Sequence, residues 1–404
     1  MKITSVWARE ILDSRGNPTL EVDVGTESSF ASAAAPSGAS TGIHEAMELR
    51  DGGARYMGKG VLKAVENVNT IIASSLMGMD VHQQEAIDRR MIELDGTPNK
   101  SKLGANAMVA TSMAVLRAAA AADSKMLHDY LGGEILPHAM FNIINGGKHA
   151  GSGLAIQEFM IIPEADLFSE RLRMASEIYH ALGKHLIRDY GPSAKNVGDE
   201  GGYAPQMANT YQALDAISSA VDELGYPCSF AIDAAASSFY NEKTDKYSID
   251  GKELSENEMV DYYLDLVKTY PIKSLEDPFY EESFNAFSEL RKTSPTLQVV
   301  GDDLVVTNVS RLNKAIQYGS ITTLLLKVNQ IGTISEAMEA VKLCRKHDIN
   351  IVVSHRSGET EDCFISDFSV GINAGQIKTG APARGERTSK YNQLLRIEEM
   401  ILSK

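Results

Sequence analysis

Six apolar segments in the second half of the chain each end in a charged or metal-binding residue, and their spacing constrains the fold more than any other feature. The segments end at Asp233, Glu276, Asp302, Lys327, His355 and Lys378. The intervals are 23 to 28 residues after a first interval of 43, about the length of one strand, one helix and two short loops. In a parallel α/β barrel the C-terminal ends of all strands share one face. The sequence therefore predicts a pocket where three carboxylates, two lysines and a histidine meet.

Two domains of unequal size are predicted from the length of the chain and from how its patterns change. The 404 residues exceed a typical single domain but fit one large barrel with a smaller partner. Residues 1 to about 35 alternate as strands do, and helical periodicity follows over residues 62–76, 81–94 and 103–122. We therefore expect an α+β domain at residues 1–131 that caps a C-terminal α/β barrel at residues 132–404.

The barrel is expected to begin with antiparallel strands. Two apolar runs, MFNIING and EFMIIP, lie close enough along the chain to pair in that way. Helical patterns cover about 168–190 and 209–224, and strands alternate with helices from Phe230 to the end. The predicted fold class is thus α/β, a TIM-like barrel with an antiparallel start.

Charge and cysteine content exclude several classes of function. The net charge of −15 and the pI near 5.1 disfavour binding to nucleic acid or to an anionic membrane. Three widely separated cysteines form neither a disulfide framework nor a zinc-binding spacing, so we expect a reducing compartment, the cytoplasm. The alanine-rich stretch at residues 108–122 is broken by Arg117 and predicts a buried helix rather than a membrane span.

The three carboxylates at strand ends favour a magnesium site. Asp233, Glu276 and Asp302 offer hard oxygen ligands without sulfur or imidazole, a set that suits Mg²⁺ better than zinc. A single acidic residue in such a position could instead cap the following helix. Helix capping does not account for three acidic residues at consecutive strand ends, so metal binding is the better interpretation.

The two lysines at strand ends suggest acid–base chemistry. Lys327 follows five apolar or β-favouring residues, TTLLL, which a solvated surface lysine would not explain. Burial, a nearby metal ion and Lys378 would each lower the pKa of its amine and leave a usable base near neutral pH. Lys378 is better suited to remain charged and to neutralise an anion that develops during a reaction.

Long blocks of the sequence resemble those of the enolase family. In the second half these are SLEDPF (274–279), GDDL (301–304), LLLKVNQIGT (324–333), SHRSGETED (354–362) and QIKTGAPARGER (376–387). In the first half they are ILDSRGNPTLEV (11–22), PSGASTGIHEAMELRD (36–51), FNIINGGKHAG (141–151), QEFMIIP (157–163) and NVGDEGG (196–202). The similarity covers essentially the whole chain in the same order. It implies a lyase with two Mg²⁺ ions per active site that reversibly dehydrates 2-phosphoglycerate to phosphoenolpyruvate through an enolate.

The resemblance also implies roles for individual residues. The ligands of the first metal ion match Asp233, Glu276 and Asp302. Lys327 matches the base that removes the α-proton, and Lys378 matches the lysine that contacts the substrate carboxylate. The loop at residues 37–42 matches one that closes over the substrate, and Ser40 matches a residue that contributes to the second metal ion.

A second group of matches concerns the leaving hydroxide and the phosphate. Glu200 matches the acid that helps hydroxide leave, with Glu158 beside it, and we expect the two carboxylates to hold one proton between them. His149 matches a residue near the leaving hydroxyl. His355, Arg356 and Ser357 match the segment that holds the substrate, the last two on its phosphate. The family is usually dimeric and sometimes octameric, so a homodimer is expected.

One departure and two alternative functions are open at this point. Ser238 stands where the family commonly has a glutamate, and we expect local consequences only. A second enzyme hypothesis keeps the barrel but acts on another acid or a sugar acid, against which Arg356, Ser357 and the 37–42 loop argue. A third hypothesis is a non-catalytic binding protein on the same scaffold. Such a protein would lack a metal ligand or the base, and none is missing here.

Overall fold

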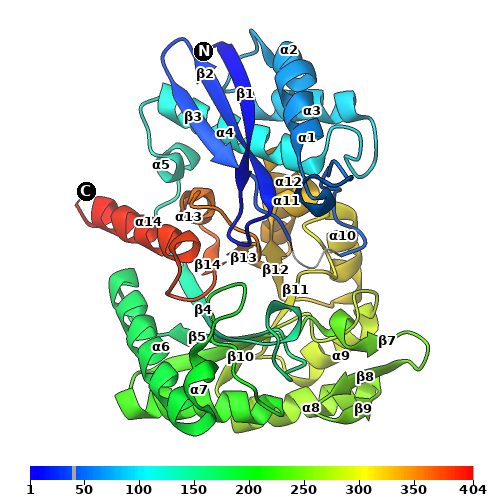
Figure 1. Cartoon of the computed structure of the whole chain (residues 1–404), viewed down its shortest axis with the longest axis vertical. Coiled ribbons are helices and arrows are strands. Elements are labelled where there is room, and N and C mark those ends of the chain that lie inside the picture. Colours follow the sequence, from blue (N-terminus) through cyan, green and yellow to red (C-terminus); the bar gives the residue numbers. More distant parts are fainter. Residues whose placement is uncertain (39–41, 404) are drawn as a thin grey trace.

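An antiparallel sheet of three strands organises the N-terminal part of the molecule (Figure 1). The structure is a computed structural model that describes residues 1–38 and 42–403. The strands are β1 (Ile3–Leu12), β2 (Pro18–Thr26) and β3 (Phe30–Ala34). The Asp13 carboxylate closes the first turn by accepting hydrogen bonds from the N–H groups of Arg15 and Asn17, both at 2.9 Å. The strands expected for residues 1 to about 35 are confirmed.

Helices cover one face of this sheet. They are η1 (Arg55–Gly58), α1 (Leu62–Glu66), η2 (Asn67–Ile72), α2 (Ala73–Leu76), α3 (Gln84–Asp95), α4 (Ala105–Ala122) and α5 (Leu127–Leu131). The predicted helix at 62–76 is continuous through α1, η2 and α2, with a π-helical middle. Helix α4 packs on β2 and β3. Within the described residues it alone is long and apolar enough to span a membrane, but 83% of it is buried inside the protein, as expected of a core helix.

Eight strands close into a barrel in the C-terminal part. They are β4 (His138–Asn145), β5 (Glu158–Pro163), β6 (Cys228–Asp233), β10 (Ile272–Glu276), β11 (Gln298–Gly301), β12 (Thr323–Leu326), β13 (Asn350–Ser354) and β14 (Gly375–Lys378). Strand β5 runs antiparallel to both β4 and β6, and the other neighbours are parallel. The predicted antiparallel start is therefore confirmed. Seven buried side chains fill the barrel interior: Met140, Met160, Ile162, Ala231, Val300, Leu325 and Val352.

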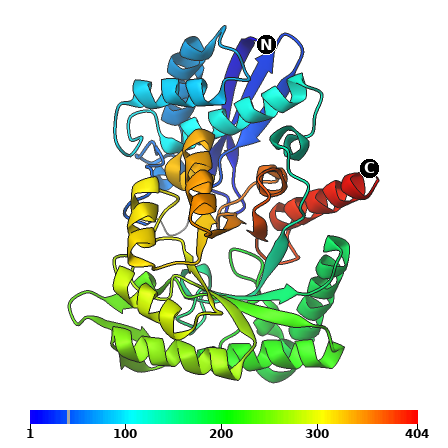
Figure 2. The same cartoon turned by 180° about the vertical axis from the view of Figure 1, so that it is seen from behind.

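Helices surround the barrel on its outer side (Figure 2). The longer ones are α6 (Phe168–Tyr190), α7 (Thr210–Leu224), α8 (Glu256–Thr269), α9 (Phe284–Thr293), α10 (Val309–Tyr318), α12 (Ile334–Lys346), α13 (Phe364–Gly371) and α14 (Gly385–Leu402). The short ones are η3 (Gly147–His149), η4 (Pro192–Lys195), η5 (Ala236–Ser238) and α11 (Val328–Ile331). Polar caps set several helix starts: Ser255 makes a capping box with Glu258 before α8, and Thr333 caps α12.

The regular alternation of strand and helix expected after Phe230 is wrong at one place. A small antiparallel sheet of β7 (Tyr240–Asn241), β8 (Lys246–Ile249) and β9 (Lys252–Leu254) lies between β6 and α8. Its insertion explains why the first interval between strand ends is much longer than the others. The turns within YNEKTDKYSIDGKEL, with positive φ at Asp245 and Gly251, were a signal for these hairpins.

The N-terminal sheet and helices pack directly against the barrel, with α11 and α12 between them in Figure 1. Asp88 of α3 accepts hydrogen bonds from the N–H (2.9 Å) and hydroxyl (2.6 Å) of Ser335 at the start of α12. Arg117 of α4 forms an ion pair with Asp362 at 2.6 Å. These buried polar contacts fix the N-terminal part over the face where the barrel strands end.

Candidate active site

The residues at the strand ends converge as the spacing predicted. Lys378, the last residue of β14, is buried, and its Nζ atom lies 2.9 Å from Asp233 Oδ2 and 2.9 Å from both Glu276 oxygens. Glu158 Oε1 is a further 3.2 Å neighbour. Burial opposes a charged amine, but the surrounding carboxylates outweigh it and raise the pKa of Lys378 well above its usual value. Lys378 therefore stays charged, as expected of a group that neutralises anions.

Lys327 and Asp302 form a second buried ion pair. The Nζ atom of Lys327 lies 2.5 Å from Asp302 Oδ2, and the amide of Gln330 donates to Oδ1 at 2.8 Å. We expected a lowered pKa for Lys327. Burial does act in that direction, but Asp302 at this distance outweighs it and raises the pKa of the lysine. The protonation state of Lys327 is therefore controlled by Asp302.

Two further aspartates, which the sequence analysis did not single out, adjoin this pair. Asp277 accepts from the N–H groups of Asp302 (2.9 Å) and Asp303 (2.6 Å). Ligand oxygens of Asp277, Asp302 and Asp303 all lie within 4.8 Å of one another. Burial, with Asp302 next in effect, raises the pKa of Asp303 to about 8. Their position directly after Glu276 and Asp302, at the same strand ends, could have indicated from the sequence that they belong to the site.

The donor set fits a magnesium ion. Asp233, Glu276 and Asp302 are buried, end neighbouring strands β6, β10 and β11, and offer only oxygen. The ammonium groups of Lys327 and Lys378 form ion pairs with these carboxylates and offset part of their negative charge, although burial and then the charge of Asp233 raise the pKa of Glu276 well above its usual value. Asp233 and Asp302 line the same pocket as Lys327 and Lys378, and its cavity volume is about 20 Å³.

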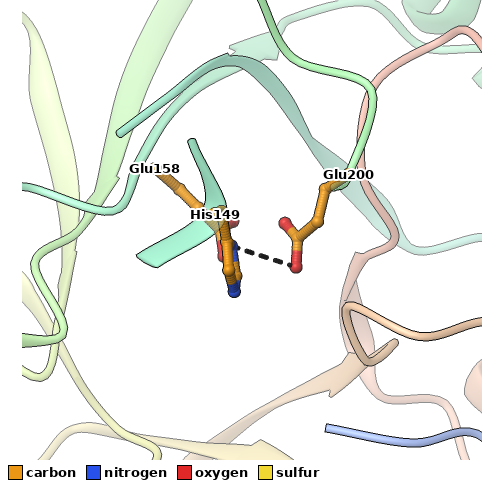
Figure 3. Close-up of side chains that lie close together, drawn as sticks. All are labelled: His149, Glu158 and Glu200. Atoms are coloured by element: carbon orange, nitrogen blue, oxygen red, sulfur yellow. Dashed lines mark ion pairs between the residues drawn. The ribbon is translucent and has the colours of Figure 1, made fainter. Parts of the chain in front are cut away.

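His149, Glu158 and Glu200 form a separate cluster in the same pocket (Figure 3). The His149 Nδ1 atom lies 3.4 Å from Glu200 Oε1 and 3.7 Å from Glu158 Oε1. Burial first, and then the nearby charge of Glu200, raise the pKa of Glu158 well above normal. Burial would do the same to Glu200, but His149 and His355 outweigh it and lower its pKa. The two carboxylates thus share one proton, which rests on Glu158.

The segment after β13 brings three more predicted residues to the pocket. His355, Arg356 and Ser357 are all buried, and His355 Nε2 lies 3.5 Å from Glu200 Oε2. Arg356 Nη1 donates to Glu45 Oε2 at 2.9 Å and to Asn329 Oδ1 at 3.0 Å. Glu45 comes from the N-terminal part and was not singled out in the sequence analysis. No pattern along the chain indicates that it pairs with Arg356.

Residues of the N-terminal part contact the segment after β13, which lines the pocket. Ser37 and Gly358 exchange two backbone hydrogen bonds of 2.8 Å, which attach the start of the 37–42 loop to the segment after β13. Arg15, in the first hairpin turn, donates to the Ser357 hydroxyl at 3.3 Å. Ser40 lies outside the described residues. Ser238 is exposed at the end of η5 and is not among the residues that line the pocket.

The fold and the site together define a protein of the α/β-barrel class, with a pocket of buried carboxylates and lysines at the strand ends and an N-terminal capping part. Comparison with known proteins makes this specific. The family model described as "Enolase, C-terminal TIM barrel domain" matches residues 133–404, and "Enolase, N-terminal domain" matches residues 3–131. The chain belongs to the enolase family.

Curated relatives are similar over nearly their whole length. The enolase of Methanosarcina barkeri is 57% identical over 406 residues, which cover 98% of this chain and 94% of that protein. The enolase of Methanocaldococcus jannaschii is 56% identical, with 100% and 96% covered. That of Pyrococcus furiosus is 55% identical, with 98% and 95% covered.

Proposed function

We propose that this chain reversibly dehydrates 2-phosphoglycerate to phosphoenolpyruvate in glycolysis and gluconeogenesis, with Lys327 as the base and Glu200 as the acid. It is a lyase, a phosphopyruvate hydratase. The observation that carries the residue assignment is that a buried lysine and a pair of carboxylates holding one proton share a pocket with an oxygen-only ligand set. A base, an acid and a site for a cation are what removal of a weakly acidic α-proton followed by loss of hydroxide requires.

Asp233, Glu276 and Asp302 would hold the first Mg²⁺, and Ser40 would contribute to the second. When bound, the ions stabilise the charge that develops on the substrate carboxylate as the enolate forms, as in enolase-superfamily sites generally. Lys378 adds a fixed positive charge within 3.2 Å of Glu158 and 2.9 Å of Asp233, so it is placed to contact that same carboxylate.

Lys327 is proposed as the group that takes the α-proton. In the structure Asp302 holds its ammonium form. If Asp302 shared its charge with a metal ion, burial and the positive charge of Arg356 would lower the pKa of the amine. Lys327 would then be able to act as a base once the site is loaded.

Glu200 is proposed as the acid that protonates the departing hydroxide, receiving for that step the proton that rests on Glu158 in the structure, with His149 as a neighbour of both. The 3.4 Å contact between His149 and Glu200 and the Glu200–Asn142 hydrogen bond of 2.9 Å orient the carboxylate. Arg356 and Ser357 are proposed to bind the phosphate, for which the planar guanidinium is well suited. His355 holds the substrate between them and Glu200.

The two alternative functions differ in what they predict for one assay. Purified protein should convert 2-phosphoglycerate to an ultraviolet-absorbing enol product when Mg²⁺ is present and lose that activity in a chelator. Activity that survives the chelator would refute the metal assignment. Equal turnover of non-phosphorylated glycerate would favour a different acid dehydratase, and binding without turnover would favour the non-catalytic scaffold.

Two variants separate the proposed base from the proposed acid. Lys327→Ala should abolish exchange of the α-proton with solvent, because no other group would take it. Glu200→Gln should retain that exchange and lose formation of the enol product, because only the second step needs the acid. Retained exchange in Lys327→Ala would place the base elsewhere.

We also propose the domain boundary at residues 131 and 132, a homodimer as the assembly, with an octamer as the alternative, and the cytoplasm as the location. The boundary is supported by the positions of α5 and β4, between which Gly133 packs so tightly that an added Cβ would lie 1.8 Å from the Val370 carbonyl oxygen. The cytoplasm is supported by three free cysteines, all with thiols buried at least in part.

A further inference from the structure

Arg387, in the first turn of α14, is completely buried and connects the two chain segments that form the acid side of the pocket. Its Nη1 atom lies 2.6 Å from His355 Nδ1 and 2.7 Å from the Arg356 carbonyl oxygen. Its Nη2 atom donates to the carbonyl oxygens of Ser357 at 2.6 Å and Asp199 at 3.0 Å. One side chain thus contacts the backbone beside the proposed acid and the backbone of the proposed phosphate-binding segment.

The contact with the imidazole determines which of its nitrogens carries a proton. A guanidinium group has donors only and keeps its charge in proteins. His355 Nδ1 must therefore be the acceptor, so it has a lone pair and no proton, and the ring is neutral with its proton on Nε2. Nε2 lies 3.5 Å from Glu200 Oε2 and has no closer hydrogen-bond partner among the described residues.

We infer that Arg387 is a positioning residue for the reaction, which holds His355 as the Nε2–H tautomer facing Glu200 and clamps the phosphate-binding segment to the acid. The inference rests on the proposed function for the role of Glu200 and deepens it. With the other tautomer, the lone pair of Nε2 would face the Glu200 carboxylate and repel it. The Nε2–H tautomer instead offers a donor to Glu200 or to a substrate oxygen.

Two other observations agree with this role. Burial is the main cause that lowers the pKa of His355 to about 4, and the charge of Arg387 acts in the same direction, so the ring is neutral across the working range of a cytoplasmic enzyme. Gly380 permits the close packing of the arginine, because a Cβ there would lie 2.7 Å from Arg387 Cδ and 2.8 Å from the Glu200 carbonyl oxygen. The lack of a side chain at position 380 therefore leaves room for Arg387.

The first test needs no variant. Protein labelled with ¹⁵N-histidine, without substrate, should show the His355 resonances of a neutral ring with a protonated Nε2, assigned by their loss in His355→Gln. A proton on Nδ1, or a charged ring near neutral pH, would overturn the inference. Because the protein is at rest, this result does not depend on whether the proposed activity is correct.

The second test compares Arg387→Met with Arg384→Met. Methionine removes the donor, whereas a lysine would still offer only donors to His355 Nδ1. Arg384 also binds the carbonyl oxygens of Gly198 (3.0 Å) and Asp199 (3.3 Å) but does not touch His355, so it is a matched control for loss of a backbone clamp. We expect Arg387→Met to mix the His355 tautomers and to lower kcat by about 10- to 100-fold, the range found for partners that orient the side chains of metal sites. Arg384→Met should leave the tautomer unchanged.

The outcomes distinguish positioning from simple structural support. An unchanged tautomer in a folded Arg387→Met variant would overturn the inference, and so would equal tautomer mixing in Arg384→Met. If Arg387→Met does not fold, the tautomer measured in the unaltered protein decides the question. If His355 of the unaltered protein is the Nε2–H tautomer but the protein has no activity, the proposed function is contradicted. The inference that Arg387 sets the tautomer would still hold.

Discussion

The Nζ atom of Lys327 lies 2.5 Å from Oδ2 of Asp302, so the proposed base and a proposed metal ligand form one buried ion pair. Their strands, β11 and β12, are neighbours in the barrel, and the parallel pairing of Gly301 with Leu324 fixes the separation of the residues that follow. An ion bound to this carboxylate would compete with the ammonium group for the same oxygen. Metal binding and the protonation of the proposed base would therefore be coupled through Asp302.

Replacing the base should tighten metal binding. In Lys327→Met the positive charge beside Asp302 is gone, so we expect Mg²⁺ to bind at least about tenfold more tightly, about 1.4 kcal/mol, although catalysis is lost. Isothermal titration calorimetry near neutral pH without substrate measures this. Lys273→Met is the control, because Lys273 is exposed near the start of β10 and forms no ion pair within the described part of the chain. Weaker Mg²⁺ binding in Lys327→Met would contradict the coupling.

Lys378 should matter for stability as well as for the reaction. Lys378→Met leaves Asp233, Glu276 and Glu158 buried without their shared cation. Breaking a buried ion pair by removing one partner costs about 3–5 kcal/mol, so the free energy of unfolding should fall by that amount in a chelator. Mg²⁺ should restore more of it than in the unaltered protein, because the ion replaces the missing charge. Urea denaturation with and without Mg²⁺ measures both the loss of stability and the stabilisation by the ion. Equal stabilisation by Mg²⁺ in Lys378→Met and in the unaltered protein would refute this explanation.

The sequence predicted the strand ends well because a parallel barrel imposes a rule that links position in a strand to position in space. Asp233, Glu276 and Lys378 end their strands, and Asp302 and Lys327 directly follow theirs. The lengths of α6 and α7 agree closely with the periodicity for the same reason, since one amphipathic face must meet the barrel.

Contacts between distant segments were not predictable in this way. Glu45 and Arg356 are 311 residues apart, and their ion pair depends on how the N-terminal part sits on the barrel. The raised pKa of Lys327 was missed for a related reason, because burial and charge act in opposite directions and only the 2.5 Å distance to Asp302 decides between them. Patterns along a chain indicate which groups meet, but they do not give the distances that set their chemistry.

Asp88 should contribute to the attachment of the N-terminal part to the barrel. Its carboxylate is surrounded by donors, with the hydroxyls of Ser112 and Ser335 both at 2.6 Å. Asp88→Asn would turn an NH₂ group toward one of them, and a buried unsatisfied donor costs about 1–3 kcal/mol. Removing the buried charge offsets only part of this loss, because burial raises the pKa of Asp88 in spite of these donors. Chemical denaturation should show the decrease, whereas Glu85→Gln on the exposed side of α3 should have little effect, and equal changes would contradict the role of Asp88.

His82 should make stability depend on pH. Its ring lies between two carboxylates, with Nδ1 3.0 Å from Asp80 Oδ1 and Nε2 3.0 Å from Asp123 Oδ1. Asp80 first and Asp123 second raise the pKa of the imidazole above its usual 6.5. A group whose pKa is raised on folding stabilises the protein fully below the unfolded pKa, about 6.5, and loses that contribution as the pH rises through the folded value. His82 therefore stabilises the protein in mild acid and not in alkali.

The change His82→Gln tests this sign. Because the ring is largely solvent-exposed, screening limits its contribution to no more than about 1 kcal/mol. The difference in the free energy of unfolding between the two proteins should be present near pH 6 and vanish near pH 9, since the imidazole is neutral there. His347→Gln, at another exposed histidine, controls for loss of an imidazole from the surface. A difference that is the same at both pH values would mean that His82 acts through packing or neutral hydrogen bonds rather than through its charge.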